Sequence, residues 1–78
     1  LSKSWERLWN MIETLANIKK ILVDFSLNSG KLNLLEADFV VLSNEKTYSL
    51  IDESINKFGE IDMAYIVDEY KKWLKERL

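Results

Sequence analysis

The chain has 78 residues, 47% of them hydrophobic, and contains neither cysteine nor histidine. Its length suits one small domain, and the two missing residue types exclude disulfides, metal sites built on thiolate or imidazole, and catalysis by Cys or His. Eleven basic and thirteen acidic residues give a net charge of −2, which does not favour binding to the phosphates of nucleic acid.

These features predict a single intracellular domain over residues 1–78, whether the chain is complete or part of a longer protein. No apolar run is long enough to cross a bilayer, and no basic segment followed by an apolar one marks a signal peptide. Neighbouring acids such as Asp52 and Glu53 point in different directions on a helix, and no serine has a plausible base beside it. We therefore expect no enzymatic activity, no metal and no cofactor.

The first predicted element is a helix over about residues 4–25. Trp5 and Trp9 lie one turn apart on it, so they either pack this helix onto the others or anchor a partner. Residues 21–25 are β-branched and aromatic enough to be extended instead. The helix is predicted because its apolar residues recur at spacings of three and four: Trp5, Leu8, Trp9, Ile12, Leu15 and Ala16.

A second helix is predicted to begin after the turn at residues 28–30. Asn33 and Glu36 have the spacing of a capping box, which would start a helix that ends near Leu42. The alternative is a hairpin over residues 27–34 followed by a strand over residues 39–42. In either case, we expect the polar residues 43–45 to interrupt the chain.

Two further helices are predicted in the second half of the chain. The first covers residues 48–58 and ends at Gly59, a residue that readily closes a helix at positive φ. Asp62 then caps the last helix, which has a clear apolar stripe from Met63 to Leu74. The expected fold is therefore a mainly α, compact domain of four helices.

The loops before the second and fourth predicted helices repeat one phrase, Gly-x-aliphatic-Asx. Gly30 is followed by Leu32, and Gly59 is followed by Ile61. This pattern resembles the paired loops of the EF-hand family, which have glycine at the sixth position and an aliphatic residue at the eighth. The resemblance implies two helix-loop-helix units joined by a very short antiparallel strand pair through Leu32 and Ile61.

The resemblance does not extend to the calcium ligands. The first, third, fifth and twelfth loop positions hold Phe25, Leu27, Ser29 and Glu36 in one loop, and Ser54, Asn56, Phe58 and Tyr65 in the other. These side chains supply too few carboxylates for calcium. The resemblance therefore implies degenerate hands, like those of calmodulin-like or myosin-light-chain-like lobes that hold the amphipathic helix of a partner.

We accordingly expect a non-catalytic module that binds another protein, through an amphipathic helix, in an apolar groove. One alternative is a small nucleic-acid-binding regulator, with a helix-turn-helix over residues 48–74. Another is an assembly domain that forms a homodimer through its first helix. The residues expected to bind the partner are the large apolar ones of the three main stripes: Trp5, Trp9, Leu35, Phe39, Leu42, Ile66, Tyr70 and Trp73.

Overall fold

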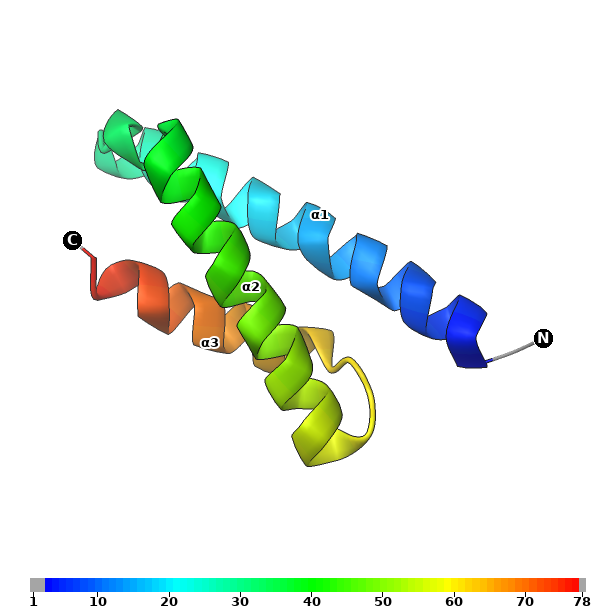
Figure 1. The fold of residues 1–78 in the computed structure, drawn as a ribbon. Helices are drawn as coiled ribbons and strands as arrows, with labels where there is room; N and C mark the ends of the chain where they lie inside the picture. Colours follow the sequence, from blue (N-terminus) through cyan, green and yellow to red (C-terminus); the bar gives the residue numbers. More distant parts are fainter. Residues whose placement is uncertain (1–2, 78) are drawn as a thin grey trace.

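The computed structural model describes residues 3–77 and consists of three α helices and one 3-10 turn (Figure 1). Helix α1 spans Lys3–Ser29, helix α2 spans Ala37–Phe58 and helix α3 spans Met63–Lys75. The 3-10 turn η1, Leu32–Leu35, joins α1 to α2. Helix α3 packs against both longer helices, which contact each other much less than they contact α3.

The prediction of four helices is wrong because α2 continues through Ser43, Asn44 and Glu45, where we expected a break. Ser43 and Thr47 face the core rather than solvent. The Thr47 hydroxyl donates to the Ser43 carbonyl at 2.8 Å, and the Ser43 hydroxyl is hydrogen-bonded to Tyr70 at 2.6 Å. Because their hydroxyls are satisfied inside the fold, these residues do not interrupt the helix, although their type favours turns in isolation.

The expected strand pair is also wrong, since no strand forms anywhere in residues 3–77. Leu32 begins η1 and is mostly exposed, whereas Ile61 lies buried in the loop before α3. The hairpin alternative is wrong too, because residues 27–29 complete α1. Asn33 lies within η1, and α2 begins at Ala37 with Glu36 as an N-cap that makes no side-chain bond. The buried Leu34 side chain anchors η1 on the core, which explains why this segment folds as a tight turn.

Both glycines make the turns that the sequence predicts. Gly30 has φ 71° and Gly59 has φ 75°, in the left-handed region that glycine tolerates best. A buried serine braces each turn: Ser26 donates to the Lys31 carbonyl at 2.6 Å, and Ser54 donates to the Glu60 carbonyl at 2.8 Å. In each case the acceptor belongs to the residue directly after the glycine, so the end of one helix holds the start of the next segment.

The N-cap predicted for the last helix is confirmed. The Asp62 carboxylate accepts a hydrogen bond from the Tyr65 amide at 3.1 Å, as a capping side chain does. The Asp62 amide in turn donates to the Ser54 hydroxyl at 2.8 Å. The beginning of α3 is therefore fastened to the last turns of α2.

Helix α3 supplies the centre of the core. Tyr70 is completely buried, and its ring lies 5.6 Å from that of Trp73, which in turn lies 5.6 Å from Phe39 on α2. The Arg77 guanidinium covers the outer face of Trp73 at 4.5 Å. The remaining buried apolar side chains come from every element: Ile18, Leu22, Leu34, Leu50, Ile51, Ile61, Ile66 and Leu74.

Replacing Gly59 tests whether the turn depends on positive φ. A Cβ at this position would meet no atom within 4 Å, so the cost of Gly59→Ala comes from backbone strain alone. We expect a loss of about 1 kcal/mol in the free energy of unfolding, measured by urea denaturation. Gly59→Asn should lose less, because asparagine tolerates this conformation better; equal losses for the two variants would contradict the explanation.

Replacing Tyr70 tests the buried hydrogen bond and its pH dependence. Burial raises the pKa of Tyr70 above its ordinary value of 10.0. The unfolded chain therefore releases this proton first, so the contribution of Tyr70 to stability is complete below pH 10 and is lost as the pH rises further. Tyr70→Phe should cost about 1–2 kcal/mol at neutral pH by leaving Ser43 unpaired. It should also flatten the alkaline fall in stability.

Candidate functional site

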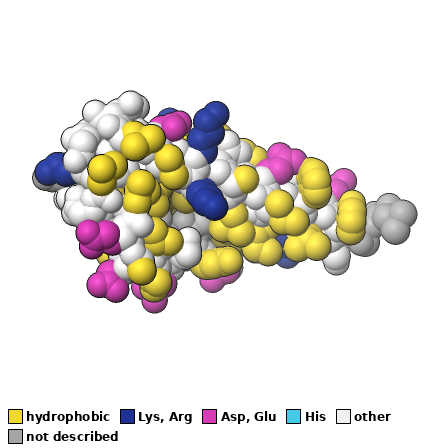
Figure 2. All heavy atoms as spheres, turned by 90° about the horizontal axis from the view of Figure 1, so that it is seen from above, with side chains coloured by type: hydrophobic (Ala, Val, Ile, Leu, Met, Phe, Trp, Pro, Cys, Tyr) yellow, Lys and Arg dark blue, Asp and Glu magenta, His cyan; other side chains and the backbone are white. Residues whose placement is uncertain are grey.

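The N-terminal part of α1 extends beyond the other two helices (Figure 1). The molecule measures 43 × 20 × 19 Å, and this projecting segment, residues 4–12, is called the arm. Four large apolar side chains on one side of the arm surround a shallow hollow of about 100 Å³. Their exposed fractions are 65% for Trp5, 47% for Leu8, 55% for Trp9 and 49% for Ile12. Figure 2 shows hydrophobic side chains gathered along this end of the molecule.

A groove of about 460 Å³ lies between α1 and α2, on a side that α3 does not line. Its walls are mostly apolar, and the two hydroxyl groups of its lining residues Ser43 and Thr47 are already hydrogen-bonded within the fold. Lys19 is the single cation among its lining residues. The groove is lined by Leu15, Ile18, Lys19, Leu22, Val23, Leu35, Val40, Ser43, Asn44, Thr47 and Tyr48.

A seven-residue repeat in α1 connects the arm to the groove. Trp5, Ile12 and Lys19 occupy one set of equivalent positions, and two further sets are Leu8, Leu15 and Leu22, and Trp9, Ala16 and Val23. Seven residues are nearly two helical turns, so the three sets lie along one side of the helix, except that Leu22 is buried in the core. We call this side the outer stripe and define it as Trp5, Leu8, Trp9, Ile12, Leu15, Ala16, Lys19 and Val23.

Helix α1 therefore has two apolar faces. Ile18 and Leu22 are buried in the core, and Met11 and Phe25 pack against it. Along the arm the outer stripe is turned away from that core, and its four large side chains keep about half or more of their surface exposed. Contiguous exposed apolar surface of this kind marks sites of interaction with other molecules.

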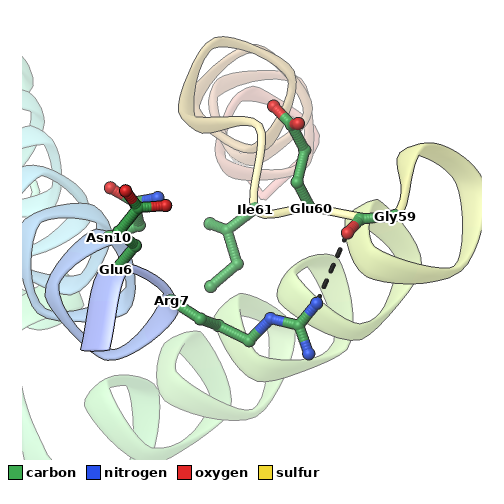
Figure 3. Close-up of a pocket in the computed structure, with 6 residues that line it drawn as sticks. All are labelled: Glu6, Arg7, Asn10, Gly59, Glu60 and Ile61. Atoms are coloured by element: carbon green, nitrogen blue, oxygen red, sulfur yellow. Dashed lines mark hydrogen bonds between the residues drawn. The ribbon is translucent and has the colours of Figure 1, made fainter. Parts of the chain in front are cut away.

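The opposite side of the arm is polar and is tied to the loop between α2 and α3. Arg7 Nη2 donates to the Gly59 carbonyl at 3.3 Å, across a hollow of about 340 Å³ (Figure 3). In this view the Glu60 side chain points away from the guanidinium, so Arg7 binds the backbone of the loop and not that carboxylate. This bond links the arm to the C-terminal end of α2, where unpaired helix carbonyls attract a cation.

The residues predicted to bind a partner do not lie together. Trp5 and Trp9 are exposed on the arm, Leu35 lines the groove, and Leu42 is exposed on α2. Phe39 is half-buried against Trp73. Ile66 and Tyr70 are completely buried and Trp73 nearly so, which makes these three core residues rather than walls of an open groove.

Sequence reasoning overlooked the residues that extend the exposed surface from the tryptophans into the real groove. These are Leu8, Ile12, Leu15, Val23, Val40 and Tyr48. The seven-residue repeat is the sequence pattern from which the α1 residues of this set could have been identified. The α2 members carry no such signal, because the packing angle of the two helices decides whether they are open.

A polar cluster fastens α3 to α2 on the surface. The Tyr65 hydroxyl donates to the Glu53 carboxylate and accepts from Lys57 Nζ at 3.2 Å. The bond to Glu53 raises the pKa of Tyr65, and the bond to Tyr65 raises the pKa of Lys57. Phe58 packs edge-on against the Tyr65 ring at 5.2 Å. The contacts of this cluster join α2 to α3.

Within residues 3–77, no three acidic side chains come together in a way that could hold a metal ion. In the same residues, no helix combines the length and the apolar character needed to cross a membrane.

In comparisons with known proteins, the chain matches no family model, no curated protein and no solved structure. The resemblance to EF-hand loops is not tested by these comparisons and stays a prediction from the sequence.

Removing the Arg7 guanidinium tests whether it steadies the arm. Because the bond is exposed, Arg7→Ala should change the free energy of unfolding by no more than about 0.5 kcal/mol. The amides of residues 4–12 should nevertheless exchange with solvent several times faster, as measured by hydrogen exchange. Lys20→Ala, another exposed cation on α1, serves as the control. Unchanged exchange in the arm of Arg7→Ala would show that Arg7 does not hold it.

Proposed function

We propose that the protein is a non-catalytic interaction module, working inside the cell, that binds an amphipathic helix of a partner protein along the outer stripe of α1. The observation that carries this proposal is the set of four large apolar side chains exposed side by side on the arm. Their spacing, i, i+3, i+4 and i+7, is the spacing by which two helices contact each other along a shared apolar seam.

The chemistry of these side chains supports tight binding. Tryptophan is enriched among the residues that dominate binding energy, and the arm carries two tryptophans one turn apart. Both stand on a continuous helix, so little conformational entropy is lost when they are covered. The α1–α2 groove continues the apolar surface beyond the arm and offers Val40 and Tyr48 as a second wall.

The proposed surface differs from the groove predicted from the sequence. The type of partner is the same, an amphipathic helix, but the contact residues move from α3 to α1 because Ile66, Tyr70 and Trp73 are used in the core. Trp5 and Trp9 are retained, and Leu35 remains at the edge of the groove.

Fluorescence titration with a synthetic amphipathic helix tests the proposal. The probe is a peptide of leucine, lysine and glutamate without net charge, and the protein carries Trp73→Phe so that only Trp5 and Trp9 report. At a protein concentration at which sedimentation gives a single chain, we expect their emission to shift to shorter wavelength as the probe removes them from water. Trp9→Ala should raise the Kd of the probe by roughly tenfold or more.

Val41→Ala is the matched control, because Val41 is 57% exposed on α2 and does not line the groove. It should leave the Kd unchanged. An emission maximum that does not move at saturating probe, or equal weakening by Val41→Ala and Trp9→Ala, would count against the outer stripe as the binding surface.

A further inference from the structure

We infer that the helix bound by the outer stripe is α1 of a second copy of this chain, running antiparallel to the first. This inference rests on the proposed function, because it names the partner of the same surface. The resulting dimer would join two helices along the length of the seven-residue repeat.

The seven-residue repeat has the pattern of a helix-pairing seam. In a two-helix coiled coil, apolar residues recur at the first and fourth positions of each heptad. Trp5 and Ile12 stand at the first position of successive heptads, and Leu8 and Leu15 stand at the fourth, whereas Leu22, the next fourth position, is buried in the core. The repeat from Trp5 to Val23 covers roughly 27 Å at 1.5 Å per residue, which is long enough for a continuous seam. Packing within one chain buries Leu22 and part of Leu15, but it leaves the four large side chains of the arm exposed and so does not account for that half of the repeat.

The two ends of the outer stripe have complementary shapes. At the arm the stripe projects, with Trp5, Leu8 and Trp9 standing out; at the other end it sinks into the α1–α2 groove. A two-fold axis between Ile12 and Leu15 brings each arm onto the groove of the other copy. Such a contact uses the same surface on both copies and closes on itself, as symmetric dimers do.

The position of Lys19 decides the direction of the two helices. In a parallel, in-register pair Lys19 would lie beside Lys19 of the second copy, and two like charges would meet in an apolar seam. The antiparallel arrangement places Lys19 against Leu8 of the second copy, with the Trp5 and Trp9 rings on either side. The aliphatic part of the Lys19 side chain then packs on this leucine, and its ammonium group contacts the face of one of the two tryptophan rings.

Sedimentation over a range of concentrations tests the association. We expect the mass to change from one chain to two as the concentration rises. Ile12→Glu and Ala16→Glu should each raise the dimer Kd by roughly thirtyfold or more, since each puts a charge in the seam. Ala16 is exposed, so its replacement leaves the core intact, and circular dichroism checks the helix content of both variants. Val41→Glu, with the same chemistry outside the seam, should dimerise like the parent chain.

Spin labels test the direction of the helices, and the absence of cysteine allows a single label to be placed at will. In the antiparallel dimer, the labels on Glu13→Cys of the two copies lie close together near the two-fold axis. The labels on Asp24→Cys of the two copies lie roughly 30 Å apart in the direction of the helices. A parallel dimer would give similar distances for both labels and would overturn the inference.

The two proposals fail in different ways. A chain that remains monomeric at every concentration but binds the synthetic helix overturns the dimer and leaves the proposed function standing. If Ile12→Glu and Ala16→Glu dimerise as strongly as the parent chain, the outer stripe is not the dimer interface and the inference is overturned. A monomer that does not bind the synthetic helix removes both proposals.

Discussion

The packing of α3 against both longer helices is the contact on which the rest of the molecule depends. Tyr70 is completely buried and hydrogen-bonded to Ser43, and Trp73 stacks between Tyr70 and Phe39. Helix α3 has 13 residues, however, whereas α1 has 27. It therefore covers only part of one face of α1. The exposed arm follows from this difference in length, and the α1–α2 groove lies on a side that α3 does not line.

Small hydroxylated residues give this core its specific geometry. Thr14, Ser26, Ser43, Thr47 and Ser54 are all buried, and every one of their hydroxyls has a hydrogen-bond partner. Ser26 and Ser54 hold the two turns, while Ser43 sets the contact between α2 and α3. These bonds help to define the turns and the helix contact because an unpaired buried hydroxyl is costly.

The features of the fold that could be predicted are those decided by neighbouring residues. The positive φ of Gly30 and Gly59 and the cap at Asp62 follow from local chemistry, and the sequence predicts them correctly. The continuity of α2 through Ser43 depends on Tyr70, far away in the chain, and local pattern cannot show it. Trp5 and Trp73 show the same limit of prediction from local pattern. Both lie on apolar stripes, but the arrangement of the helices leaves Trp5 exposed and buries Trp73.

The separation of the arm from the core has a consequence for how the sequence can change. Trp5, Leu8 and Trp9 are absent from the buried core, so substitutions among them alter what the surface recognises while leaving the folded body nearly as stable. Tyr70 and Leu50 have no such freedom, because every change there disturbs packing on several elements. Binding and folding therefore depend on different residues of the same chain. The binding surface can change in sequence while the core residues stay the same.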